Sequence, residues 1–290
     1  MKCNLFDFNN LAVRIFFSSA VNAKSPRPDY ELWRYIVFDN IFKSITKNGG
    51  ADEVVLAVDN RNPWRKQYWA RYKESRKYKR DTSGADWDRF HIELAKLSSD
   101  LKHHVPFKVI QIRSAEADDI IAVICMTYPE NKYTIISTDE DYLQLYNENT
   151  RIYNPLQKKF LEYDHPEEFV IKKCLMGQPK DDILNVKTPL DWSREERKPP
   201  LGEQAANKIM SYGYEKWLKE NKLEKRFRVN RILIDFNLIP NVIRERVLKE
   251  YNEYSYPEPE QIFNFLKENE FGAYIDKFDM VEKKLLNLYK

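Results

Sequence analysis

The chain has 290 residues, of which 42% are hydrophobic and 32% charged, and its formal net charge is +3. This is the composition of a globular protein with a sizeable core, and so small a net charge is no argument for nucleic-acid binding. No apolar run approaches the roughly 20 residues of a membrane span, and the N-terminus lacks a signal-peptide layout. With seven glycines and no GxGxxG or Walker-type motif, a glycine-rich nucleotide loop is excluded.

The three cysteines indicate the redox compartment. Cys3, Cys125 and Cys174 have no metal-binding spacing, and each stands among apolar neighbours. We therefore expect reduced thiols in the core of a cytoplasmic protein.

Apolar runs followed by acids recur along the first part of the chain. Residues 3–6, 54–58, 107–112 and 133–136 have the character of buried strands. The acids that follow these runs are Asp7, Asp59, Glu116, Asp118, Asp119, Asp139 and Asp141. A further acid, Asp181, follows a predicted helix at 167–176. Helix capping alone could explain several of them, and for Asp139 capping and metal binding are equally supported. Because parallel strands end at one edge of a sheet, we expect these acids to converge.

Helical spacing dominates the rest of the sequence. Residues 30–45, closed by Asn48-Gly49-Gly50, and residues 87–102 predict helices, and 151–155 predicts a fifth strand. After a polar loop at 187–200, helices are expected at 202–212, 223–236, 241–251, 259–267 and 278–289. The last of these is expected to dock on its own domain. The pattern predicts an α/β domain with a parallel sheet, followed by an all-helical region.

Residues 61–80 form a basic and aromatic segment with nine Lys or Arg and a single acid, Glu74. On one continuous helix, Arg65, Lys73, Arg76 and Arg80 would lie within about 80° of one another, with Tyr72 beside them. A solvated helix is the alternative, but such a helix usually mixes charges of both signs. Cations interleaved with aromatic rings favour single-stranded nucleic acid.

Converging carboxylates indicate a hard metal ion. At about 4 Å, two carboxylates repel by roughly 4 kcal/mol at an effective dielectric of 20, so the cluster needs a cation. Oxygen-only ligands select Mg²⁺, for which Mn²⁺ can substitute, and a cluster of this size suggests two ions. Two ions can activate water and stabilise the leaving oxygen of a phosphoryl displacement.

These residues resemble the 5′ nuclease (flap endonuclease) superfamily and, within it, the ribonuclease H group of T-even bacteriophages. The resemblance is carried by Glu116-Ala-Asp-Asp119, Ser137-Thr-Asp-Glu-Asp141 and Tyr72-Lys73-x-x-Arg76, with Asp7 and Asp59 at strand ends. It implies a PIN-like (Rossmann-like) catalytic domain at 1–183, with a helical arch at about 61–95. A smaller helical domain that binds duplex DNA is implied at 184–290.

The resemblance also implies roles for individual residues. The first metal ion would be held by Asp7, Asp59, Glu116, Asp118 and Asp139, and the second by Asp141 and Asp181; Asp119 is a weaker, outer candidate. Lys73 and Arg76 would reach the scissile phosphate, Tyr72 would stack on a base, and Arg65 and Arg80 would bind the substrate strand. Gln178 stands where the family has an aspartate, and the 198–202 stretch departs from the usual helix-hairpin-helix loop.

The implied activity is Mg²⁺-dependent 5′-to-3′ exonuclease and flap endonuclease cleavage, which removes RNA primers in phage replication. The expected substrates are flap DNA and RNA–DNA duplexes, and the expected protein partners are a replication clamp and a single-stranded-DNA-binding protein. We expect a monomer without membrane contact, in the cytoplasm of the bacterial host. The alternatives are a PIN-type ribonuclease and a non-catalytic DNA-binding accessory protein.

Overall fold

The computed structural model describes residues 1–25, 27–47, 50–163, 165–193 and 195–289. The chain divides into two compact units, which we describe separately. The first comprises Met1–Arg61, Ser83–Glu162 and Asn241–Lys290, and the second comprises Asn62–Thr82 and Tyr163–Pro240. These units do not coincide with the division expected after residue 183, because the basic segment packs with the helical part and the C-terminal helices pack with the sheet. Among the described residues, no helix is long and apolar enough to cross a membrane.

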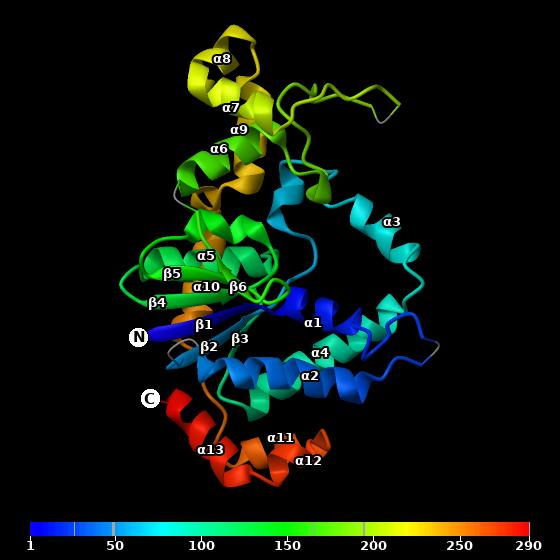
Figure 1. Ribbon diagram of the computed structural model, residues 1–290, viewed down its shortest axis with the longest axis vertical. Helices are drawn as coiled ribbons and strands as arrows, with labels where there is room; N and C mark the ends of the chain where they lie inside the picture. The colour runs from blue at the N-terminus through cyan, green and yellow to red at the C-terminus, as the bar shows by residue number, and fades with distance from the viewer. Residues whose placement is uncertain (26, 48–49, 164, 194, 290) are drawn as a thin grey trace. The chain divides into compact units, whose positions relative to one another are not determined.

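A six-stranded sheet forms the centre of the first unit (Figure 1). Its strands are β1 Lys2–Asp7, β2 Glu53–Ala57, β3 Lys108–Ile110, β4 Lys132–Ile136, β5 Thr150–Asn154 and β6 Lys159–Leu161. The spatial order is β3-β2-β1-β4-β5-β6, and all neighbours are parallel except the antiparallel pair β5–β6. The predicted parallel α/β sheet is therefore confirmed. The hairpin strand β6 was not predicted, since its three residues carry little pattern.

Helices cover both faces of this sheet, as Figure 1 shows. The helices of the first unit are α1 Phe8–Phe16, α2 Tyr30–Ser44, α4 Trp87–His104, α5 Ala117–Thr127, α10 Asn241–Asn252, α11 Gln261–Glu268, α12 Gly272–Ile275 and α13 Phe278–Leu286. The short 3₁₀ helices η3 Glu140–Leu145 and η6 Asn287–Tyr289 complete it. The predicted closure of α2 at Asn48-Gly49 lies outside the described residues.

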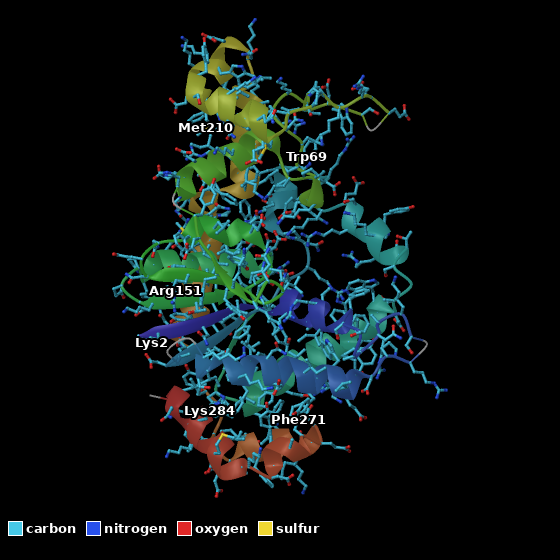
Figure 2. All side chains as sticks on the ribbon, in the orientation of Figure 1. Lys2, Trp69, Arg151, Met210, Phe271 and Lys284 are labelled. Carbon is cyan, nitrogen blue, oxygen red and sulfur yellow. The ribbon has the colours of Figure 1, made fainter. Side chains whose placement is uncertain are left out.

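The C-terminal helices join the core of the first unit, whereas the last segment was expected to dock on the helical domain at 184–290. Phe271 stacks against Phe38 of α2 with ring centroids 5.5 Å apart, and the Lys284 ammonium lies 4.2 Å from the Phe42 ring centroid (Figure 2). Val281 is fully buried in the same cluster. The burial of these apolar side chains explains why residues 241–290 belong with the sheet rather than with the preceding helices.

The second unit is built from helices around its own apolar cluster. Its elements are η2 Trp64–Gln67, α3 Ser75–Asp81, α6 Pro166–Met176, η4 Pro179–Asp181, α7 Glu203–Tyr212, α8 Tyr214–Glu220, α9 Glu224–Ile234 and η5 Phe236–Leu238. Cys174, Ile183 and Val186 are among the buried residues of the cluster. The Arg226 guanidinium lies 4.7 Å from the ring centroid of Trp69, which Figure 2 labels. All three cysteines of the chain are free and buried, as predicted.

The prediction of one continuous helix over residues 64–80 is wrong. The segment begins as the 3₁₀ helix η2, continues through turns, and becomes α-helical only from Ser75. Lys73 has a φ of 56°, a left-handed conformation that an α-helix interior does not accommodate. Trp69 and Tyr72 pack into the apolar cluster of the second unit instead, so tertiary contacts override the helical spacing.

A buried charge network links β2, β3 and α10 in the first unit. Glu53 accepts hydrogen bonds from the Tyr251 hydroxyl at 2.6 Å and from the Lys108 ammonium at 2.5 Å. The Lys108 ammonium also lies 4.0 Å from the Tyr251 ring centroid. The network ties α10 to the sheet, and within it Lys108 supplies the cation that pairs with the buried Glu53 carboxylate.

Lys108→Ala should lower the free energy of unfolding by about 3–5 kcal/mol, because it leaves the buried Glu53 carboxylate without its cation. Lys102→Ala is the matched control, since the Lys102–Glu250 pair spans 3.0 Å but both side chains are at least 40% exposed. Its cost should stay below about 1 kcal/mol. Urea titrations of both variants measure the difference, and equal costs would contradict the structural role assigned to Lys108.

Candidate metal centre and nucleic-acid interface

The sheet order reverses direction between β1 and β4, and the predicted acids Asp7 and Asp139 stand at the ends of these two strands. From β1 the order runs through β2 to β3 on one side and through β4 to β5 on the other. Open α/β sheets bind ligands in the crevice at the carboxyl ends of such strands. Asp7 is the last residue of β1, and Asp139 stands three residues after β4.

Asp7 lies close to the carboxylates of other acidic side chains. Burial and then the charge of Asp59 raise the pKa of Asp7 to about 7, and the charge of Asp139 acts in the same direction. One carboxylate oxygen accepts a hydrogen bond from the backbone N–H of Asn10 at 3.0 Å, so Asp7 also caps α1. The other oxygen accepts the hydroxyls of Ser137 at 3.4 Å and Tyr142 at 3.3 Å. Asp7 is therefore both a cap and a charged neighbour of two predicted ligands.

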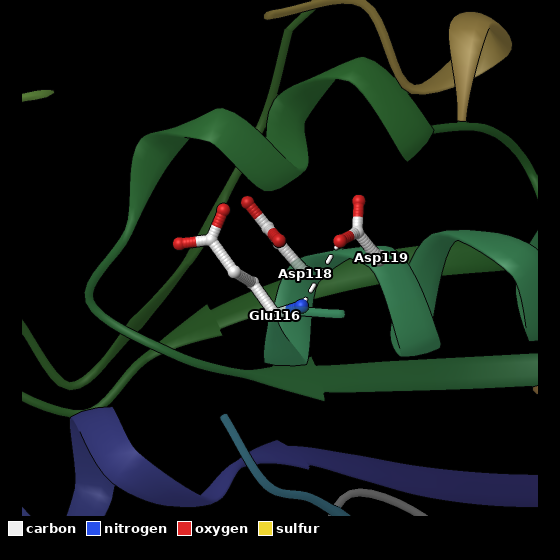
Figure 3. Close-up of side chains that lie close together, drawn as sticks. All are labelled: Glu116, Asp118 and Asp119. Atoms are coloured by element: carbon white, nitrogen blue, oxygen red, sulfur yellow. Dashed lines mark hydrogen bonds between the residues drawn. The ribbon is translucent and has the colours of Figure 1, made fainter. Parts of the chain in front are cut away.

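The start of α5 brings three more acids together (Figure 3). Ligand oxygens of Glu116, Asp118 and Asp119 lie within 4.8 Å of one another. The Asp119 carboxylate accepts the Glu116 amide at 2.9 Å, and the two residues form a capping box. The backbone amide of Ala117 also donates to Asp59 at 2.8 Å, which joins the end of β2 to the same helix start.

The loop after β4 is held by hydrogen bonds to α1. The Asn10 amide group donates to the Thr138 hydroxyl at 2.8 Å, and the Asn10 oxygen accepts the Thr138 amide at 3.2 Å. Asp139 accepts the Asp141 amide at 3.0 Å and so caps η3. Asp141 is buried beside it. The capping alternative for Asp139 is thus present, and the capping bond uses one of its two carboxylate oxygens.

The chemistry of this donor set fits a divalent metal ion. The donors are carboxylate oxygens, which suit Mg²⁺ or Mn²⁺ and not the softer metals that cysteine favours. The carboxylates repel one another, because the charges of Asp59 and Asp139 contribute to the raised pKa of Asp7. The described residues of the first unit that could hold an ion include Glu116, Asp118, Asp7, Asp59 and Asp139.

Asp181 lies in the second unit, where it contacts two of the predicted catalytic cations. The Arg76 guanidinium lies 2.5 Å from the Asp181 carboxylate, and the Lys73 ammonium lies 4.0 Å from the same oxygen. The Lys73 amide also donates to the Asp181 carbonyl at 2.9 Å. The resemblance implied contact with the scissile phosphate for Lys73 and Arg76 and metal binding for Asp181, and the structure brings these three residues together.

The predicted substrate-binding residues differ in their exposure. Arg65 is 1% exposed, and its guanidinium donates to the Leu233 carbonyl at 2.9 Å, so it anchors the segment to α9. Tyr72 is 2% exposed within the apolar cluster, so base stacking would require the segment to rearrange. Arg80 is half-buried at the end of α3. The aromatic ring that α3 does expose is Tyr78, at 72%.

Gln178 and Asp182 have structural partners in the second unit. Gln178 is buried, and its backbone pairs with Ile183 across an antiparallel bridge. Asp182 has a φ of 57°, and its carboxylate accepts the Ser75 amide at 2.7 Å at the start of α3. The Asp182 side chain thus holds the start of α3 in the basic segment.

Sequence reasoning missed the polar residues that orient these acids. The sequence pattern did not assign Tyr142, Asn10 or Ser137 a role in orienting the acids, although each has a hydrogen bond to Asp7. A signal was present, because a tyrosine at a buried position among acids carries a hydroxyl that needs a partner.

Two family profiles together match residues 2–280 of the chain. The profile described as "5′-3′ exonuclease, N-terminal resolvase-like domain" matches residues 2–174, and the one described as "T4 RNase H, C terminal" matches residues 164–280. Ribonuclease H of Enterobacteria phage T4 is 28% identical over 276 residues, which is 90% of each chain. A 5′-3′ exonuclease of Buchnera aphidicola is 27% identical over 161 residues, about half of each chain.

Solved structures show the same fold. A bacteriophage T5 flap endonuclease, solved as a complex with DNA and metal ions, superposes with a TM-score of 0.65 at 20% identity. The match covers 93% of this chain and 98% of that one. The T5 5′-exonuclease with bound zinc gives a TM-score of 0.61 at 17% identity. With the family profile covering residues 2–174, the chain belongs to the 5′-3′ exonuclease family and is a nuclease.

Proposed function

We propose that this nuclease is a Mg²⁺-dependent 5′-to-3′ exonuclease and flap endonuclease that cuts RNA–DNA and DNA–DNA duplexes at 5′ ends. The proposal rests on the acidic side chains near the point where the strand order reverses. They come from the ends of β1, β2 and β4 and from the start of α5. Primer removal during phage replication in the host cytoplasm is the process that this activity serves. The likeness to a phage ribonuclease H supports that context.

In the proposed mechanism, Asp7, Asp59, Glu116, Asp118 and Asp139 hold one divalent ion in the first unit. Asp141 in the first unit and Asp181 in the second unit are the candidate ligands for further metal binding. When bound, such ions activate water and stabilise the leaving oxygen of a phosphodiester. Asp7 and Asp139 are oriented for this role by their capping bonds, each of which uses one carboxylate oxygen. Oxygen donors without cysteine select Mg²⁺, and Mn²⁺ can replace it.

The basic segment is proposed to engage the 5′ strand. Lys73 and Arg76 act on the scissile phosphate, and their contacts with Asp181 show that both side chains reach a predicted metal ligand. Arg80 contacts the substrate strand, Arg65 holds the segment in place, and Tyr72 stacks on a base only if it leaves its apolar cluster. The helices around α7 and α9 bind duplex DNA. The protein acts as a monomer, and its protein partners are a replication clamp and a single-stranded-DNA-binding protein.

One assay separates this proposal from the two alternatives. The protein is incubated with Mg²⁺ and a labelled 5′ flap, an RNA-primed duplex and plain single-stranded RNA. Cleavage of the first two supports the proposal, cleavage of the RNA alone indicates a PIN-type ribonuclease, and binding without cleavage indicates an accessory protein.

Asp139→Asn should abolish Mg²⁺-dependent cleavage while fork-DNA binding in EDTA is kept. An amide still caps η3, so the melting temperature should change little, whereas the charge that a metal ion needs is lost. Asp86→Asn is the matched control, because Asp86 caps α4 by the same kind of bond, to the Arg89 amide at 2.9 Å. Wild-type turnover in Asp139→Asn would reduce Asp139 to a cap.

Lys73→Ala and Arg80→Ala should have different kinetic effects. Lys73→Ala should lower kcat by about 100-fold or more, because a cation at the scissile phosphate acts mainly in the transition state. Arg80→Ala should mainly raise Kd, and with roughly five phosphates neutralised the slope of log K against log salt should be near −4. Single-turnover kinetics and salt titrations measure both. Equal small changes in Kd, with kcat unchanged, would mean that the segment is only a solvated surface.

The metal-free protein should lose stability as pH rises from about 4 through 7, because the pKa of Asp7 is raised to about 7 in the folded state. In that range the folded state binds the proton more tightly than the unfolded state, so deprotonation costs folding free energy. Asp7→Asn keeps the cap on Asn10 but cannot ionise, so its melting temperature in EDTA should fall less over this range. Mg²⁺ should remove most of the wild-type loss. Parallel pH profiles for the two proteins would contradict the raised pKa.

A further inference from the structure

Tyr142 is a buried tyrosine whose hydroxyl lies among the predicted metal ligands. It is the third residue of η3 and is 1% exposed. Its hydroxyl donates to Asp7 at 3.3 Å, and the charges that bear on it come from Asp7, Asp118, Asp139 and Asp59, in decreasing order. A side chain chosen only for packing at this position would not need an oxygen, since an apolar ring fills the same volume without a polar group to satisfy.

The bond has a defined direction. The Tyr142 hydroxyl donates, and the Asp7 carboxylate accepts at 3.3 Å. Ser137 donates to the same Asp7 oxygen at 3.4 Å, while the Asn10 amide donates to the other oxygen at 3.0 Å. Three donors from α1, η3 and the loop after β4 thus fix the Asp7 carboxylate.

We infer that Tyr142 is a positioning residue for divalent-metal binding, which orients the Asp7 carboxylate through its hydroxyl. The inference rests on the proposed function, because it requires the carboxylates to bind an ion. Hydrogen bonds from outside a metal's ligand shell fix the orientation of its ligands, and their loss usually weakens affinity by about 10–100-fold. Tyr142 also places a neutral donor among charges of one sign, so it lowers their repulsion without competing for the ion.

The test compares Tyr142→Phe with Tyr133→Phe. Tyr133 is also buried in the first unit, at 2% exposure, but its hydroxyl donates to backbone carbonyls of Ile124 and Tyr128 at 3.4 and 3.0 Å. Calorimetry measures Mn²⁺ binding to each DNA-free protein. We expect the dissociation constant of Tyr142→Phe to rise by about 10-fold or more, and that of Tyr133→Phe to stay within about 2-fold of wild type.

A double-mutant cycle shows whether Tyr142 acts through Asp7. If it does, Tyr142→Phe should add little further loss of Mn²⁺ affinity in an Asp7→Asn background. Ser137→Ala, which removes a second donor to the same oxygen, should give a smaller loss of the same kind. In cleavage assays, the Mg²⁺ concentration for half-maximal rate should rise for Tyr142→Phe, while kcat at saturating Mg²⁺ should largely recover.

The outcomes distinguish a failure of the metal centre from a failure of the role given to Tyr142. If wild type does not bind Mn²⁺ at all, the proposed metal centre fails, and the inference fails with it. If wild type binds and Tyr142→Phe binds equally well, only the inference is overturned. The inference is also overturned if Tyr133→Phe loses as much affinity, because the effect would then be one of packing.

Discussion

Repulsion between carboxylates at the switch point of the sheet is the constraint around which the first unit is built. Burial and the charges of Asp59 and Asp139 raise the pKa of Asp7 to about 7. Carboxylates held this close destabilise the folded state, so the rest of the fold must hold them in place. The parallel pairing of β1 with β2 and β4 does so, because it brings the ends of these strands to one edge of the sheet.

Backbone amides and small polar side chains compensate part of this repulsion. Asp7, Asp59 and Asp139 each accept a backbone amide, from Asn10, Ala117 and Asp141 respectively. Capping and metal binding are therefore not competing interpretations of these acids. The bond that caps a helix also orients the carboxylate, and it uses only one of the several lone pairs that an ionised carboxylate offers.

The parts of the fold that depend on local pattern could be predicted from sequence. Buried parallel strands appear as apolar runs, and the long helices α2 and α4 bury apolar residues at helical spacing, so both were found. The expectation that the acids converge needed only that parallel strands end at one edge, whereas the strand order and its switch point became known from the structure. The basic segment could not be predicted in this way, since Arg65 and Tyr72 are buried by contacts with residues far along the chain, such as Leu233. Its helical period was real in the sequence but lost to tertiary packing.

The second unit joins its predicted cations to its predicted metal ligand. Asp181 accepts the Arg76 guanidinium with its side chain and the Lys73 amide with its carbonyl, and Asp182 accepts the Ser75 amide. Three residues around the start of α3 are thus tied to two consecutive residues of η4 and its cap. A displacement of the basic segment must therefore carry Asp181 with it or break several bonds at once. Charge explains why the pairing is stable without substrate: each cation gains a carboxylate, and Asp181 gains the neutralisation that a metal ion would otherwise supply.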